Sequence, residues 1–162
     1  MTTATAAWSS DSGAGADAGT PMLLSRLGGE LFAVDLRAAE EALEFPELEE
    51  LPGMAGSAMG VFELRGQLVS VYSAERALAV KRVEQRGVVV VLRARTRRIA
   101  IALDDVEDVI MVNFSEVKRL APRDAADGVL LGIARHGSDL VGIVDVETLI
   151  TACVGASDGV HS

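Results

Sequence analysis

The chain has 162 residues, of which 49% are hydrophobic and only 4% aromatic, which is enough for one domain with an aliphatic core. Its formal net charge of −9 argues against nucleic acid or an anionic membrane surface as a partner, because both need a basic face. No apolar run approaches the length that spans a bilayer, there is no secretory signal pattern, and the single Cys153 excludes an internal disulfide framework. We expect a cytoplasmic protein that is not embedded in a membrane.

The first twenty residues are mostly small or polar and cannot bury enough apolar surface to become ordered. They are predicted to form a disordered N-terminal tail. A hairpin over residues 22–27 and 30–36, turning at Gly28 and Gly29, is the first expected element. Residues 40–50 then hold six glutamates and no basic residue, and a solvated acidic loop is the interpretation for most of them.

The central part of the chain predicts two further hairpins separated by a short helix. The first covers residues 60–71 and bends at residues 65–67, and residues 73–79 form the helix. The continuous apolar run of residues 88–92 is typical of a strand buried on both faces. It is followed by an arginine-rich bend and a return strand over residues 99–103.

An acidic group follows that return strand, and it consists of Asp104, Asp105, Glu107 and Asp108. It lacks the alternating oxygen ligands and central glycine of a calcium loop. We interpret it as a solvated strand edge or as a partner for the nearby arginines, and we predict no metal site.

The last part predicts a hairpin and a terminal helix. Residues 130–134 and 140–144 flank a polar turn with a glycine, and residues 146–154 carry apolar side chains at helical spacing. Residues 156–162 are expected to be a flexible tail. Many short strands with regular turns indicate an all-β architecture, and the repeated order of elements is compatible with two small barrels packed together.

Catalytic machinery is not evident in the sequence. His136 falls in a predicted turn, His161 falls in the C-terminal tail, and Cys153 lies on the apolar face of the last helix. No nucleophile elbow or phosphate-binding glycine loop is present. We therefore expect an interaction protein without enzymatic activity or cofactor. A small enzyme with an unrecognised site, built on His136 or on the acidic group, is the alternative.

Three segments resemble signatures of the CheW family of chemotaxis coupling proteins. They are Gly-Val-Phe-Glu-Leu-Arg-Gly-Gln-Leu-Val at 60–69, Ile-Ala-Leu-Asp-Asp-Val-Glu-Asp-Val at 101–109, and the run from 132 to 150 that ends in Val-Asp-Val-Glu-Thr-Leu-Ile. A weaker match starts at Glu30 and includes Glu40 and Glu41. Together the matches cover about residues 23–154, and we place the CheW-like domain at residues 21–155.

The resemblance implies two packed five-stranded SH3-like barrels with a hydrophobic core between them. It also implies a non-catalytic scaffold at chemoreceptor arrays, which binds the signalling domain of a methyl-accepting chemoreceptor and the regulatory domain of a CheA-type histidine kinase. Arg65 and Glu41 match family positions and are expected to pair and to shape the contact surface. Gly66 supplies the turn conformation. The family's apolar receptor groove matches Ala39, Val88, Val106 and Val109.

The sequence departs from the family pattern after the Leu-Arg-Gly turn. The family usually continues with Pro-Val-Ile-Asp-Leu-Arg, whereas residues 70–76 here read Ser-Val-Tyr-Ser-Ala-Glu-Arg. One of the two binding surfaces is therefore open to change, and a divergent accessory module that binds a receptor but not a kinase is the second candidate.

Overall fold

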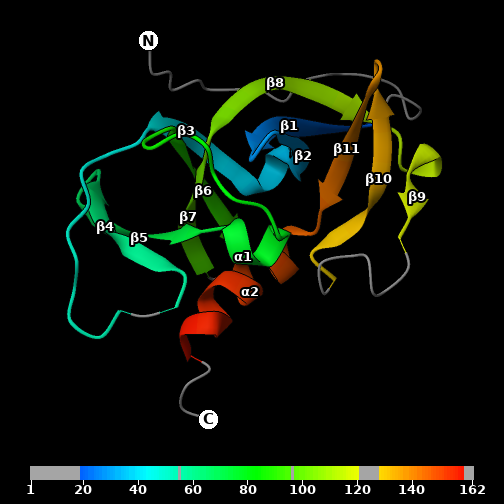
Figure 1. The fold of residues 1–162 in the computed structure, drawn as a ribbon. Coiled ribbons are helices and arrows are strands. Elements are labelled where there is room, and N and C mark those ends of the chain that lie inside the picture. Colours follow the sequence, from blue (N-terminus) through cyan, green and yellow to red (C-terminus); the bar gives the residue numbers. More distant parts are fainter. Residues whose placement is uncertain (1–18, 55, 96, 121–127, 159–162) are drawn as a thin grey trace.

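The computed structural model describes residues 19–54, 56–95, 97–120 and 128–158, and in this part of the chain two β-sheets lie side by side above a C-terminal helix (Figure 1). The first sheet has six strands in the order β8 (Asp105–Val112), β1 (Thr20–Leu27), β2 (Glu30–Asp35), β11 (Asp139–Val144), β10 (Leu130–His136) and β9 (Lys118–Arg119). The second has five strands in the order β3 (Ala39–Glu44), β6 (Val88–Ala94), β7 (Arg97–Leu103), β5 (Gln67–Ser73) and β4 (Ala58–Leu64). The helices are α1 (Glu75–Leu78), α2 (Val146–Asp158) and the 3-10 turns η2 (Leu36–Ala38) and η3 (Phe114–Glu116).

The two sheets repeat one pairing pattern. Reading from β8 to β10 and from β3 to β4, the successive pairs are antiparallel, antiparallel, parallel and antiparallel in both. The predicted all-β class is confirmed, and the internal repeat expected from the order of elements is present. The first sheet differs from the expected five strands by the two-residue β9, which pairs with β10.

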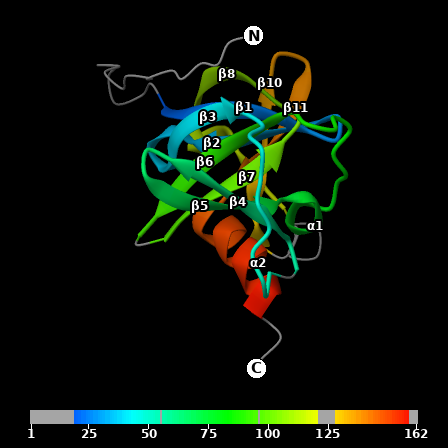
Figure 2. The ribbon, with the colours of Figure 1, turned by 90° about the vertical axis from the view of Figure 1, so that its left-hand side faces the viewer.

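The chain passes between the sheets more than once. Strand β3 follows β2 in sequence but belongs to the five-stranded sheet, and β8 follows β7 but pairs with β1. Helix α2 follows β11, yet it packs on α1 and on β4, β5 and β6 of the other sheet. The view in Figure 2, turned by 90°, shows this helix beneath the strands of the five-stranded sheet. Each sheet therefore depends on segments that arrive from the other.

Strand alternation divides the apolar residues into three cores. Along β6, Val90 and Leu92 face a core shared by both sheets and α2, whereas Val89 and Val91 face a core within the five-stranded sheet. The six-stranded sheet has its own inner core, which includes Met22, Leu24, Ala33, Val141 and Ile143. The prediction that residues 88–92 form a strand buried on both faces is confirmed, with Val88 itself only partly buried.

The four predicted hairpins and both predicted helices are present, and α2 extends beyond the expected residue 154 to Asp158. The prediction of a solvated loop at residues 40–50 is wrong for its first half, because residues 39–44 form β3 and Glu41 is only 8% exposed. A bulge between Ala39 and Glu41 breaks the alternation that a strand prediction needs. Most of the predicted N-terminal tail, and His161, lie outside the described residues.

Candidate interaction site

The turn between β4 and β5 is made by Arg65 and Gly66, with φ angles of +50° and +85°. Positive φ at both central residues is typical of the two-residue turns that suit the twist of a hairpin. Gly66 adopts this conformation without strain, whereas Arg65 is one of three non-glycine residues with positive φ in the described ranges. The turn projects the Arg65 side chain toward β3.

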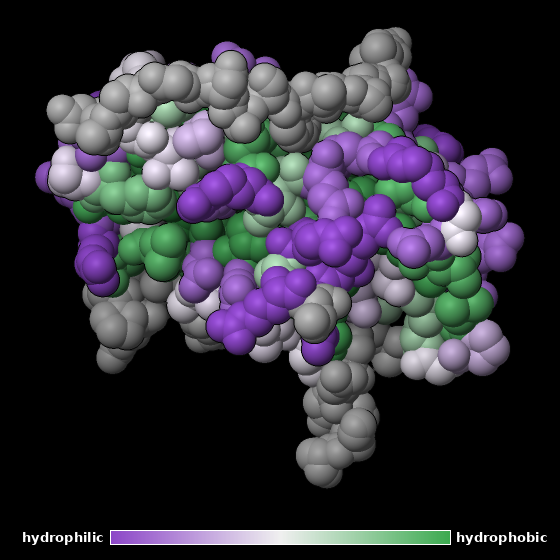
Figure 3. All heavy atoms as spheres, turned by 180° about the vertical axis from the view of Figure 1, so that it is seen from behind, coloured by the Kyte–Doolittle hydropathy of each residue, from purple (hydrophilic) through white to green (hydrophobic). Residues whose placement is uncertain are grey.

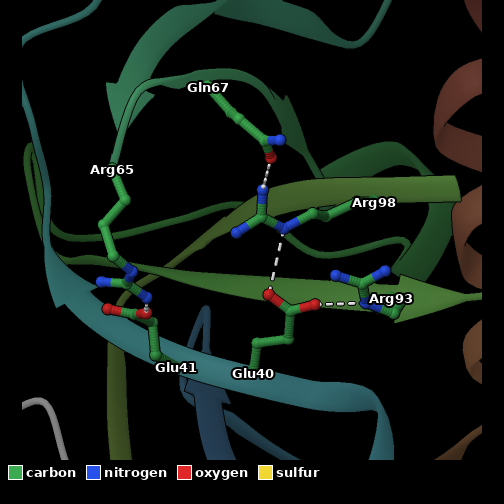
Figure 4. Close-up of polar contacts among 6 residues, drawn as sticks. All are labelled: Glu40, Glu41, Arg65, Gln67, Arg93 and Arg98. Carbon is green, nitrogen blue, oxygen red and sulfur yellow. Dashed lines mark hydrogen bonds and ion pairs between the residues drawn. The ribbon is translucent and has the colours of Figure 1, made fainter.

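Arg65 forms an ion pair with Glu41, as expected from the family resemblance (Figure 4). Glu41 lies on β3 and Arg65 directly follows β4, and these strands are the two edges of the five-stranded sheet, so the ion pair connects segments from both edges. Glu41 is 8% exposed, and a carboxylate so far from water is stabilised by a charged hydrogen-bond donor. Arg65 itself stays largely exposed, with 67% of its side chain accessible.

Glu40, the neighbouring residue, lies between two arginines of the next hairpin. Its carboxylate accepts hydrogen bonds from Arg93 and from Nε of Arg98, the latter at 3.0 Å, and Nη1 of Arg98 donates to Gln67 at 2.9 Å. Burial opposes ionisation of Glu40, but the two guanidinium groups more than offset it, and its pKa lies below the usual value. Figure 4 shows these six residues, which we call the ion-pair cluster: Glu40, Glu41, Arg65, Gln67, Arg93 and Arg98.

The apolar positions of the expected receptor groove are brought together only in part. Ala39 is a buried member of the core between the sheets, and Val88 and Val106 are partly buried and pack against that same core. Val109 lies on β8, an edge strand, and is 38% exposed. Their role as a recognition groove remains a prediction.

Asp104 does not belong to the solvated acidic edge in which the sequence places it. It is 5% exposed, and its carboxylate accepts hydrogen bonds from the backbone N–H groups of Gly28 at 2.6 Å, Val83 at 3.0 Å and Glu84 at 2.8 Å. Burial raises the pKa of this carboxyl, but the hydrogen bonds lower the pKa by a larger amount, so the net shift is downward. The expected pairing with the nearby arginines at 93–98 is not present among the described ion pairs, because Glu107 instead pairs with Arg26 across β8 and β1.

The candidate catalytic residues do not converge. His136 is the last residue of β10 and is exposed beside the turn at residues 137–138. Cys153 is fully buried, and burial raises the pKa of its thiol to about 12. Within the described ranges, no three His, Cys, Asp or Glu side chains gather in a way that could hold a metal ion. In the same residues, no helix has the length and hydrophobicity to cross a membrane.

Comparison with known proteins gives one family. The model of the CheW-like domain matches residues 21–153. The chain is 27% identical over 144 residues to the chemotaxis protein CheW of Klebsiella aerogenes, and the match covers 86% of each protein. The structure resembles the scaffolding protein TtCheW of Thermoanaerobacter tengcongensis with a TM-score of 0.73 and 16% identity, over 81% of this chain and 92% of that one.

The protein has a two-sheet β fold with an ion-pair cluster, and its described residues form no convergent catalytic site. The comparisons assign this fold to a family. The chain belongs to the CheW-like family, a family of chemotaxis coupling and scaffold proteins. The likeness to TtCheW supports the fold.

Cluster residues outside the predicted set are Glu40, Gln67, Arg93 and Arg98. The sequence carries one signal for them, because the glutamates at 40 and 41 and the arginine-rich segment at 93–98 have opposite charges. The pairing of β3 with β6 is what brings the two segments together.

Proposed function

We propose that the protein is a non-catalytic coupling scaffold that binds a chemoreceptor signalling domain and the regulatory domain of a CheA-type histidine kinase. It would act in the cytoplasm, at chemoreceptor arrays. The observation that carries this proposal is the Arg65–Glu41 ion pair, because it fixes a largely exposed arginine at a defined place on the turn between β4 and β5. Family membership over residues 21–153 supports it.

A scaffold of this kind works through geometry. The scaffold would hold receptor and kinase together. If two signalling states of the receptor bind the scaffold with different affinity, that difference shifts the equilibrium between the active and inactive arrangements of the kinase. The residues proposed to contact the partners are Arg65 and Gly66 at the hairpin turn, Glu41 on β3, and Ala39, Val88, Val106 and Val109 along the groove. The rigid cores on both sides of these residues would keep their relative positions fixed.

Calorimetric titration of the purified protein with the two partner domains tests the proposal. Arg65→Glu places a carboxylate next to Glu41 and removes a guanidinium from the surface, so we expect binding to at least one partner to weaken about tenfold or more. The circular dichroism spectrum should remain that of the folded protein. Arg135→Glu is the matched control, because Arg135 is an exposed arginine on the topologically equivalent β10–β11 hairpin.

Equal affinities of the wild-type protein and Arg65→Glu for both domains would refute the assigned role of the turn. Binding to neither domain by the wild-type protein would refute the coupling function. The second candidate, an accessory module that binds only the receptor, is favoured by the altered segment at residues 70–76. In the structure, Ser73 and Arg76 of this segment border a hollow of about 690 Å3 together with the small residues 56–58. Receptor binding without kinase binding would establish it.

A further inference from the structure

The β6–β7 hairpin concentrates positive charge on a chain whose net charge is −9. Together with Arg65 it forms what we call the basic hairpin face: Arg65, Arg93, Arg95, Arg97 and Arg98. The side chains of Arg95 and Arg93 are 79% and 57% exposed, and Arg97 is exposed as well. The hairpin points to the rear of the view in Figure 1, as Figure 2 shows, and thus faces the viewer in Figure 3, where a hydrophilic band lies between hydrophobic areas.

The carboxylates that form ion pairs with these arginines are fewer than the arginines. Glu41 pairs with Arg65, Glu147 pairs with Arg95 at 3.0 Å, and the single carboxylate of Glu40 is shared by Arg93 and Arg98. Among the described residues, Arg97 forms no ion pair. Five guanidinium groups therefore share three carboxylates. The Arg95–Glu147 ion pair is exposed on both sides and exchanges readily for another, because exposed ion pairs contribute little.

We infer that the basic hairpin face binds an acidic segment of another protein. Guanidinium groups hold carboxylates through two parallel hydrogen bonds, which fixes position as well as charge. The surface thus fits a segment that carries several glutamate or aspartate side chains.

The overall charge selects a protein segment over a longer polyanion. Nucleic acid and anionic membranes extend well beyond the hairpin and meet the negative field of the whole chain. A short acidic segment feels mainly the charges within a Debye length, about 8 Å at physiological ionic strength, so the arginines of this face weigh more for it than for a longer polyanion. Arg95 and Arg97 are not among the residues proposed to contact receptor or kinase, so the inference can fail or hold independently of the coupling function.

The test is a nuclear magnetic resonance titration of the full chain with a short peptide of alternating Glu and Leu. We expect amide shifts to concentrate on the β6–β7 hairpin and the β4–β5 turn. The double variant Arg95→Glu, Arg97→Glu should weaken binding at least about tenfold, since two charge-assisted contacts become repulsive. Both side chains are exposed, so the fold should tolerate the change. The double variant Arg119→Glu, Arg135→Glu changes the net charge equally at exposed sites on β9 and β10 and serves as the control.

Three results would overturn the inference. The first is an equal loss of affinity in the two double variants, which would mean that only the net charge matters. The second is unchanged binding when Gln replaces every Glu of the peptide. The third is tighter binding of a ten-residue oligothymidylate or of vesicles containing anionic lipid than of the acidic peptide. Retention of Arg65 in both variants keeps the result separate from the receptor and kinase titrations.

Discussion

Asp104 connects both sheets through backbone hydrogen bonds. Gly28 belongs to the β1–β2 turn, whereas Val83 and Glu84 belong to the segment before β6. In Asp104→Asn one acceptor oxygen becomes an amide donor, so at least one of these partly buried hydrogen bonds is replaced by a contact between two donors. We expect the free energy of unfolding, measured by urea denaturation, to fall by about 2–3 kcal/mol. Asp105→Asn, at the exposed neighbouring position, should change it little, and an equal loss in both variants would contradict this role.

The same residue makes stability depend on pH in the acid range. The pKa of Asp104 is lowered in the folded protein, so its contribution is fully present above the pKa of the unfolded chain, about 3.9. It is lost as the pH falls toward and through the lower folded value. The difference between the wild-type protein and Asp104→Asn should therefore be constant from neutral pH to about pH 5 and should shrink below about pH 4.

Cys153 is a second residue whose chemistry follows from burial. Its side chain lies in the core between the sheets, is fully buried, and has a pKa raised to about 12. Because the thiolate is the reactive species, labelling by iodoacetamide at pH 8 should be at least about a hundredfold slower in the folded protein than in urea. Mass spectrometry should show one modified thiol after unfolding, since the chain has one cysteine. Rapid labelling of the native protein would show that α2 opens frequently.

Among the elements, hairpins could be predicted and β3 could not. A hairpin carries its own signal, because apolar alternation and a glycine turn occur within about a dozen residues, as in β4 and β5. Strand β3 pairs with β6, more than forty residues away, and has glutamates at 40, 41 and 44 and a bulge. Its stability comes from that distant pairing, and local composition indicates only an acidic, solvated segment.

The same distinction applies to the candidate site. The Arg65–Glu41 ion pair was predicted from family resemblance, and the structure contains it. The remaining cluster depends on the register in which Ala39 pairs with Leu92 and Glu41 with Val91, since this register places Glu40 beside Arg93 and Arg98. Composition gives opposite charges but no register, so it could not assign those partners. Asp104 was misplaced for a similar reason, because its hydrogen-bond donors come from two distant segments.

At the scale of the whole molecule, the crossing segments predict a single cooperative unit. Strand β8 follows β7 of the five-stranded sheet but belongs to the six-stranded sheet. Helix α2 follows β11 of the six-stranded sheet but packs beneath the five-stranded sheet. Both sheets contribute side chains to the core that surrounds Leu149, which is fully buried. Neither sheet keeps its hydrophobic face covered if the other unfolds, so partial unfolding exposes a large apolar area.

Leu149→Ala tests this cooperativity. Removal of a fully buried leucine leaves a cavity and should lower the free energy of unfolding by about 2–5 kcal/mol. If the two sheets unfold together, native-state hydrogen exchange should show the same decrease for the most protected amides of β2 and of β6, although α2 follows β11 in sequence. Val141→Ala, in the inner core of the six-stranded sheet alone, should likewise lower protection in both sheets. A decrease confined to one sheet in either variant would mean that the sheets are separate folding units, and the shared core would then be an interface between domains.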